Sequence, residues 1–251
     1  MIAKKAYFLS DLHLGATYYE SNKELEKNVV RLLDEIKEDA EEIYLLGDIL
    51  DYWFEYKHVV PRGFVRFLGK LAELADSGIK ITWIIGNHDI WIFDYLPEEL
   101  GINVIDGILE KEIFGTLFCM QHGDAIGGNF KFRFIRKLFR NKICQKLYSG
   151  IHPRWTVGFA FAWSRHNRLK KQNKDEEKYQ PDSVKQIRMW CENQIKSGNP
   201  AKYFLFGHIH FLYSGALQDG RNLVVIPNLP ERGEYGVFDG KELKIKRSNL
   251  F

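Results

Sequence analysis

Short clusters of Asp, Asn and His follow five apolar segments of the sequence, and each cluster lies where a predicted β-strand ends. Carboxylate, carboxamide and imidazole groups are ligands that suit Mn, Fe and Zn. No cysteine accompanies them, which argues against a structural zinc or iron–sulfur site. The clusters are Asp11 and His13; Asp48 and Asp51; Asn87, His88 and Asp89; His122; and His208 and His210.

The position of these clusters matters more than any single residue in them. In open α/β sheets the carboxyl ends of the strands meet at one edge, so we expect the clusters to converge there. A carboxylate shared by two metals can hold them about 3.5–4 Å apart, a spacing that suits in-line attack on phosphorus. Gly47, Gly86 and Gly207 directly precede three of the clusters and allow the chain to turn sharply as it leaves a strand.

Each cluster alone has an ordinary explanation. An Asp-x-His triplet occurs by chance, a Gly-Asp pair is usually a turn, and a single buried histidine is usually a hydrogen-bonded core residue. The complete ordered set, with every member ending a predicted strand, is much harder to explain by coincidence. It predicts a two-metal hydrolase of phosphoesters or pyrophosphates.

Apolar strands alternate with helical patterns through the first half of the chain, which indicates an α/β fold with a buried sheet covered by helices. Apolar residues at helical spacing predict helices over 25–36, 64–74, 91–100 and 182–196. Residues 128–180 are rich in Lys, Arg and aromatic residues, contain no convincing strand and are interpreted as a helical insertion. The chain from Leu212 onward alternates like short antiparallel strands.

The length fits a single domain over residues 1–251 that includes the 128–180 insertion. The net charge of +3 is too small to imply a nucleic-acid partner. Three widely spaced cysteines suggest no disulfide framework and favour a reducing cytoplasm. Because neither a signal peptide nor an apolar run of about 20 residues is present, we expect a soluble or peripheral protein.

The five motifs together resemble the signature of the calcineurin-like metallophosphoesterases. The resemblance implies an α/β fold in the form of a four-layer αββα sandwich, with two divalent metal ions, expected to be Mn, as cofactors. It also implies that Asp48 bridges the two metals. One metal would take Asp11, His13, Asp48 and His210, and the other would take Asp48, Asn87, His122 and His208.

The resemblance implies catalytic roles for Asp48 and His88. The metals would supply an activated water and stabilise the charge on the phosphoryl oxygens. His88 would stand beside them, where it would stabilise the transition state or protonate the leaving oxygen. Asp51 and Asp89 would orient ligands, although a turn residue and a helix N-cap are equally good explanations of these two.

Within the superfamily the chain is most similar to the UDP-2,3-diacylglucosamine pyrophosphatases of lipid A biosynthesis. Its length, the stretch Asp51-Tyr52-Trp53-Phe54 and the helical insertion carry this similarity. The similarity implies cleavage of a lipid-linked UDP-sugar to UMP and 2,3-diacylglucosamine 1-phosphate, by an enzyme that is cytoplasmic and peripheral to the inner membrane. The implied substrate-binding residues are Asn87, His88, Ser164, Asn167, Lys170 and His208, with Ser164 at a spacing that is not the family's.

The insertion has a composition that suits an anionic membrane surface. Residues 130–147 interleave Lys and Arg with Phe, Ile and Leu and contain no acidic residue, so the segment could serve as a lid that faces lipid. A solvated basic lid packed on the core is the simpler alternative. Such a pattern also suits single-stranded nucleic acid, but the small net charge argues against a long track for it.

The best-known pyrophosphatases carry Arg where this chain has His88, so other substrates stay open. One alternative is a phosphodiesterase or phosphatase that acts on soluble nucleotides or phosphoproteins. Another is a non-catalytic scaffold, although every ligand position of the motifs is filled. A nuclease is a weaker alternative, and the sequence does not indicate an oligomeric state.

Overall fold

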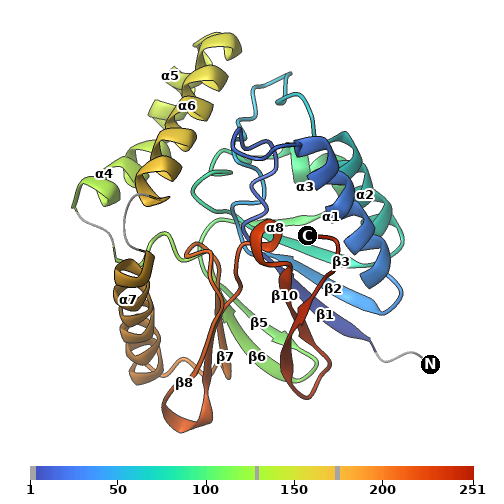
Figure 1. Ribbon diagram of the computed structural model, residues 1–251, viewed down its shortest axis with the longest axis vertical. Helices are drawn as coiled ribbons and strands as arrows, with labels where there is room; N and C mark the ends of the chain where they lie inside the picture. The colour runs from blue at the N-terminus through green and yellow to red at the C-terminus, as the bar shows by residue number, and fades with distance from the viewer. Residues whose placement is uncertain (1–3, 128–129, 173–175) are drawn as a thin grey trace.

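The computed structural model describes residues 4–127, 130–172 and 176–251 (Figure 1). Within these ranges, only the backbone is described for residues 130–133, 163, 165, 167–172 and 176–181. Two β-sheets face each other at the centre of the molecule, and helices cover their outer sides.

The first sheet has six strands in the order β11-β10-β1-β2-β3-β4. Strands β1 to β4 are parallel, whereas β10 and β11 join them as an antiparallel pair beside β1. The strands are β1 (Lys5–Leu9), β2 (Ala40–Leu45), β3 (Lys80–Ile84), β4 (Asn103–Ile105), β10 (Glu234–Phe238) and β11 (Leu243–Arg247).

The second sheet has five strands in the order β5-β6-β7-β9-β8. The strands after Leu212 pair with one another as predicted, because β8 is antiparallel to β9 and β10 is antiparallel to β11. In addition, β9 runs parallel to β7, which comes earlier in the chain. The strands are β5 (Leu109–Ile113), β6 (Thr116–Met120), β7 (Tyr203–Phe206), β8 (Tyr213–Ala216) and β9 (Asn222–Val225).

The alternation of side chains along β1 shows how the layers are built. Tyr7 and Leu9 point to the core under helices α1 (Asn22–Ile36) and α2 (Val65–Asp76), whereas Phe8 points to the core between the two sheets. The outer side of the second sheet packs against α7 (Glu176–Lys196) through a third cluster that includes Cys191. The order helix, sheet, sheet, helix confirms the predicted αββα sandwich.

Helices α4 (Phe130–Phe139), α5 (Lys142–Ser149) and α6 (Pro153–Gln172) stand together as a lobe beside the sandwich (Figure 1). They occupy most of the predicted 128–180 insertion, and α7 begins at Glu176, earlier than the expected 182. The short elements α3 (Tyr95–Leu100), η1 (Gln218–Gly220) and α8 (Leu229–Arg232) complete the chain. No helix among the described residues is long and apolar enough to cross a membrane.

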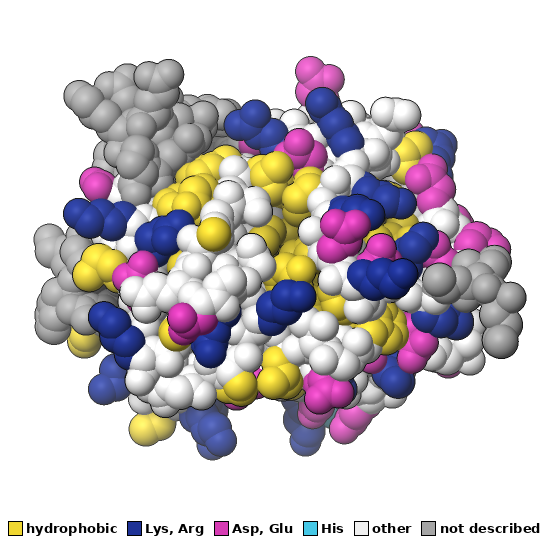
Figure 2. Space-filling model, turned by 90° about the horizontal axis from the view of Figure 1, so that it is seen from below, with side chains coloured by type: hydrophobic (Ala, Val, Ile, Leu, Met, Phe, Trp, Pro, Cys, Tyr) yellow, Lys and Arg dark blue, Asp and Glu magenta, His cyan; other side chains and the backbone are white. Residues whose placement is uncertain are grey.

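Seen from below, the sandwich shows basic and acidic side chains interspersed around patches of hydrophobic ones (Figure 2). The mixture of charge signs on this face agrees with the small net charge of the chain. A surface of this kind lacks the single-sign field that attracts a long polyanion. The statement about surface charge covers the residues that are coloured by type in Figure 2 and not the grey ones.

Candidate metal centre

Five of the predicted ligands have a backbone conformation that is rare for residues other than glycine. The φ angles are +51° at Asp11, +46° at His13, +52° at Asp48, +71° at His208 and +62° at His210. Such conformations cost energy and persist where the surrounding structure enforces them, which is typical of functional sites. The turns that end β1, β2 and β7 therefore aim these side chains at one point.

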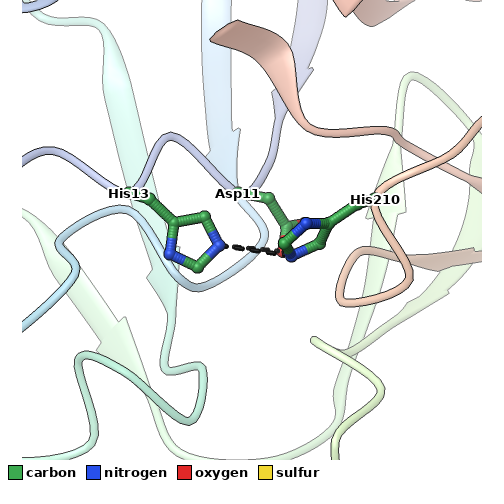
Figure 3. Close-up of side chains that lie close together, drawn as sticks. All are labelled: Asp11, His13 and His210. Carbon is green, nitrogen blue, oxygen red and sulfur yellow. Dashed lines mark hydrogen bonds and ion pairs between the residues drawn. The ribbon is translucent and has the colours of Figure 1, made fainter. Parts of the chain in front are cut away.

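The first group of ligands joins the loop after β1 to the loop after β7. The side chains of Asp11, His13 and His210 point toward one another (Figure 3). His210 Nε2 lies 3.2 Å from Asp11 Oδ1 and 3.2 Å from His13 Nε2. Two imidazole nitrogens and a carboxylate oxygen that face one another so closely are a suitable donor set for a divalent cation.

The second group consists of Asp48, His122 and His208. His122 Nε2 lies 3.2 Å from Asp48 Oδ2. The Nδ1–H of His122 donates to the carbonyl of Leu46 at 2.8 Å, so Nε2 is the ring nitrogen that faces the carboxylate. A metal would therefore bind His122 through Nε2 after this nitrogen has lost its proton.

Asp48 stands between the two groups, because its Oδ2 is 3.2 Å from His122 Nε2 and 3.9 Å from His13 Nε2. Asn87 lies next to this carboxylate, since the backbone N–H of His88 donates to Asp48 Oδ1 at 2.9 Å. The seven residues predicted as ligands come from the ends of β1, β2, β3, β6 and β7, and Asp48 lies close to members of both groups.

Several buried polar atoms in these groups make no hydrogen bond to the described residues. They include Asp11 Oδ1, Asn87 Oδ1 and His122 Nε2. A buried polar atom left without a partner is costly, and all three are atoms that can coordinate a cation. The donor set of oxygen and imidazole nitrogen and these unpaired atoms fit divalent metal ions.

Close approach of the ligand loops requires glycine at two of the predicted positions. A Cβ atom on Gly86 would overlap Asp48 Oδ1, and one on Gly207 would overlap Ser10 Oγ and lie 2.7 Å from Asp11 Oδ2. Ser10 donates to the same Asp11 oxygen at 2.6 Å. The missing side chains thus let β3 and β7 end directly against the two aspartates.

Asp51 holds two histidines and one residue of the helical lobe. Its Oδ1 lies 3.3 Å from His13 Nδ1, 3.2 Å from His88 Nδ1 and 2.9 Å from Ser164 Oγ, which donates to it. Burial alone would raise the pKa of Asp51, but hydrogen bonds from His13 and His88 and their charges hold it well below its usual range. Asp51 is therefore an anion that orients both imidazoles.

His88 lies at the rim, with its Nδ1–H donated to the Asp51 carbonyl at 3.0 Å and its Nε2 4.0 Å from Asp48 Oδ2. Burial would lower the pKa of His88, but the charges of Asp48 and Asp51 and the hydrogen bonds to Asp51 raise it to about 9 in the metal-free protein. The second ring nitrogen therefore faces the site as a donor.

Asp89 braces two of the ligand loops. One of its oxygens accepts from the Gly86 N–H at 2.7 Å, and the other accepts from the Ile49 N–H at 2.9 Å and from Trp83 Nε1 at 3.1 Å. These bonds tie the turn after β3 to the turn after β2. Asp89 does not cap a helix, since the next helix begins at Tyr95.

The predicted substrate-binding residues of the lobe are only partly described. Ser164 is buried, and its hydroxyl donates to Asp51, so α6 is tied to the site at this point. The side chains of Asn167 and Lys170 lie outside the described residues, although their backbone belongs to α6. Asn87, His88 and His208 lie at the metal centre itself.

The lobe also packs on the sandwich through aromatic residues. Tyr148 of α5 stacks on Trp91 with ring centroids 4.9 Å apart, and its hydroxyl lies 3.2 Å from that of Tyr52. Trp91 Nε1 donates to the carbonyl of Phe139 at 2.9 Å. The stretch Asp51-Tyr52-Trp53-Phe54 therefore connects the ligand loop after β2 to the lobe.

Sequence reasoning did not identify the ion pairs that tie α4 to the sandwich. Arg136 Nε donates to the buried Asp124 at 2.7 Å, and Arg140 forms an ion pair with Asp106 at 2.9 Å. Asp124 follows His122 and Gly123 directly, so its place after a strand was a signal that could have been used. No pattern in the sequence indicated its basic partners.

Two facing sheets, helices on both outer sides and two adjoining groups of Asp and His at the strand ends define a metal-dependent hydrolase. Comparison with known families agrees: residues 4–212 match the family described as calcineurin-like phosphoesterase. The chain belongs to this family.

Relatives within the family are similar to almost the whole chain. A UDP-2,3-diacylglucosamine hydrolase of Porphyromonas gingivalis is 37% identical over 96% of this chain and 97% of its own length. A protein of the same description from Neisseria meningitidis is 28% identical over 82% of each chain. A solved dimetal phosphatase from Danio rerio is more distant, with 12% identity, a TM-score of 0.49 and coverage of 100% of this chain and 98% of its own.

Proposed function

We propose that this protein hydrolyses the pyrophosphate of UDP-2,3-diacylglucosamine to UMP and 2,3-diacylglucosamine 1-phosphate, a step of lipid A biosynthesis. Relatives described as UDP-2,3-diacylglucosamine hydrolases are similar to most of the chain, and the one from Porphyromonas gingivalis is 37% identical over 96% of it. The observation that carries the chemistry is the place of Asp48, whose Oδ2 lies between His122 Nε2 and His13 Nε2. A carboxylate in this position can serve two cations at once.

We assign one metal ion to each of the two groups of side chains, with Asp48 shared between the ions. Asp11, His13, Asp48 and His210 would hold one ion, and Asp48, Asn87, His122 and His208 would hold the other. When bound, the ions supply Lewis-acid stabilisation of phosphoryl charge and a water acidified toward neutral pKa. The metal we propose is Mn, as the family resemblance implies.

We assign His88 to the phosphoryl oxygens or the leaving oxygen. Its Nδ1–H donates a hydrogen bond to the Asp51 carbonyl, which fixes the orientation of the ring. Only Nε2 is then available to donate a proton or a hydrogen bond to the substrate. Asp51 is a positioning residue that keeps this ring and that of His13 in place. A fixed donor aimed at the reacting group needs no reorganisation during the reaction.

The helical lobe is proposed as a lid for the acyl chains and as the surface that meets an anionic membrane. Its large apolar side chains are exposed, including Ile143 at 71%, Leu147 at 69% and Trp155 at 72%. Lys142 and Lys146 are exposed on α5, the helix that also carries Ile143 and Leu147. Apolar side chains among lysines favour an interface with anionic lipid. The proposed location is cytoplasmic and peripheral to the inner membrane.

The proposal is tested by incubating the Mn-loaded enzyme with UDP-2,3-diacylglucosamine in mixed micelles and measuring UMP. We expect rapid UMP release that Asp48→Ala lacks, with the bound metal reduced in the variant. Turnover of a chromogenic phosphodiester without turnover of the lipid substrate would contradict the assignment and favour a soluble phosphoester. An inert, fully metal-loaded protein would favour the scaffold alternative.

A further inference from the structure

A cavity of about 270 Å³ lies beside the second group of ligands. It is close in size to the smallest sites for small molecules, about 300 Å³, and suits a fragment such as a nucleoside. One of its walls is His122, so a group in the cavity would lie next to any phosphate held at the metal centre. The residues that line it also include Ile85, Gln121, Asp124, Ile126, Arg136 and Trp190.

Gln121 gives this cavity a polar group that lacks a partner. Its side chain is buried, with 5% exposed, and its Nε2 makes no hydrogen bond to any described residue. The backbone N–H of Gln121 is already used, since it donates to the Leu205 carbonyl at 3.1 Å. A buried amide without a partner is costly to keep, and a bound ligand would provide the missing acceptor.

Apart from His122 and the ion pair of Asp124 with Arg136, the remaining walls are apolar or aromatic. Ile85 and Ile126 contribute aliphatic surface, and the indole of Trp190 comes from α7, where it packs at 90° on Phe206. Arg136 adds a cation at the edge, held by Asp124. Apolar walls with one amide suit a planar heterocycle whose edge carries both a hydrogen-bond donor and an acceptor.

We propose that this cavity binds the nucleoside of the substrate, with the Gln121 amide paired to the edge of the pyrimidine base. The inference rests on the proposed function, because the UDP part of that substrate supplies the pyrimidine nucleoside. The cavity adjoins His122, whereas Ser164 ties the lobe to Asp51 near His13 and His88. The nucleotide would thus lie toward β6 and α7, and the lipid toward α5 and α6.

The test compares inhibition by UMP and by inorganic phosphate, with a chromogenic phosphodiester as the reporter substrate of the Mn-loaded enzyme. Phosphate shares the metal centre with UMP but has no base. Gln121→Leu should weaken UMP inhibition about 10-fold, as the loss of one hydrogen bond to a buried group implies, and leave phosphate inhibition unchanged. The matched control is Gln218→Leu at an exposed site in η1, which should change neither.

A second variant fills the cavity without touching Gln121. Ile108 lines it and is 50% exposed, so Ile108→Trp should fold and should exclude UMP while phosphate still inhibits. Equal weakening of phosphate and UMP inhibition would overturn the proposal and point to a phosphate subsite or a disturbed metal centre. Unchanged UMP inhibition in both variants would also overturn it.

Failure of the subsite and failure of the proposed function give different results. If the wild-type enzyme releases UMP from the lipid substrate but neither variant raises KM for it, only the subsite is wrong. If the wild type does not turn over the lipid substrate, the function is wrong, whatever the variants do to UMP inhibition. Because Leu removes an unpaired buried amide, Gln121→Leu should melt no lower than the wild type, so loss of the fold cannot explain lost UMP binding.

Discussion

Asp51 shows how much of the site depends on residues that are not expected to contact a metal. Its Oδ1 is shared by His13, His88 and Ser164. Asp51→Asn keeps the shape but removes the charge that orients both imidazoles. We expect a 10- to 100-fold loss of metal affinity or of turnover, roughly the range for residues that support ligands.

The measurement for Asp51→Asn is metal content after dialysis together with kcat on a chromogenic phosphodiester. Asp239→Asn is a suitable control, because Asp239 accepts two backbone N–H groups in an exposed turn, a role that Asn can also fill. Wild-type metal content and kcat in Asp51→Asn would show that the carboxylate charge is dispensable.

Protons should compete with metal at His122. Burial would lower the pKa of this residue, but the negative charge of Asp48 raises it to about 10 in the metal-free protein. The imidazole is then protonated at neutral pH and must lose its proton to bind a cation. We expect metal affinity to fall as pH falls from 8 to 6, by roughly tenfold per unit for each displaced proton.

Calorimetry of Mn binding in two buffers with different ionisation enthalpies would count the released protons. Because the pKa is raised, the protonated form is present throughout this range, so the sign is fixed: lower pH weakens binding. A proton count of zero and an affinity independent of pH would contradict the arrangement around His122.

At the residue scale the sequence indicated which Asp and His side chains lie together, but it did not indicate the contacts that surround them. Motifs at strand ends carry their own geometry, so Asp11, Asp48 and His210 could be placed before any contact was known. The sequence did not decide whether Asp51 orients ligands or only forms a turn. Its contacts are tertiary, and one partner, Ser164, lies 113 positions away along the chain. Gln121 and Arg136 were missed for the same reason, since a cavity is formed by tertiary packing alone.

At the scale of single elements, the turn after β3 depends on the absence of a side chain at Gly86. A methyl group there would overlap both Asp48 Oδ1 and the backbone nitrogen of Asp48, which follows β2. We expect Gly86→Ala to reduce turnover more than 100-fold, because a shift of about 1 Å in a catalytic group can have an effect of that size. Turnover and metal content would be measured together.

Gly69→Ala is the matched control for Gly86→Ala. Gly69 is exposed within α2, where an added Cβ meets nothing within 4 Å. The same substitution should therefore stabilise the protein by roughly 0.5–1 kcal/mol, through the helix propensity of alanine, and leave turnover unchanged. Equal loss of activity in the two variants would contradict the steric argument.

Elements with strong periodicity were predicted correctly, and errors occurred where tertiary contacts decide. The stripe over 25–36 became α1 (Asn22–Ile36) with Ser21 as its cap. The helix expected at 91–100 begins only at Tyr95, because Glu55 accepts the N–H groups of Phe93, Asp94 and Tyr95 and holds the preceding chain in a loop. The antiparallel pairs β8–β9 and β10–β11 agree with the prediction for the chain after Leu212. The parallel pairing of β9 with β7 could not be predicted, because alternation of side chains does not encode the neighbour of a strand in the sheet.

At the scale of the whole molecule, the lobe exposes large apolar side chains and lysines to solvent. Replacing Ile143, Leu147 and Trp155 together by Ser should weaken binding to vesicles that contain anionic phospholipid by more than 10-fold, since each side chain contributes about 1 kcal/mol or more when it enters the interface. Sedimentation with vesicles would measure the bound fraction.

Val65→Ser provides the control for the vesicle experiment. Val65 is 76% exposed but lies on α2, in the helical layer of the sandwich rather than in the lobe. Vesicle binding should be unchanged in this variant. The proposed membrane surface would be contradicted if the wild-type protein did not bind anionic vesicles. It would also be contradicted if the wild-type protein bound neutral vesicles as strongly as anionic ones.

The left-handed backbone at five metal-site residues restricts which amino acids evolution or design can place there. Asp, Asn and His both coordinate cations and accept positive φ more readily than other residues with side chains. Cys and Glu also coordinate, but they lack this conformational tolerance. A substitution at these positions must therefore satisfy two requirements: the new side chain must coordinate a cation, and its backbone must accept a positive φ angle. Replacing these ligands by cysteine would require a change in the turns as well.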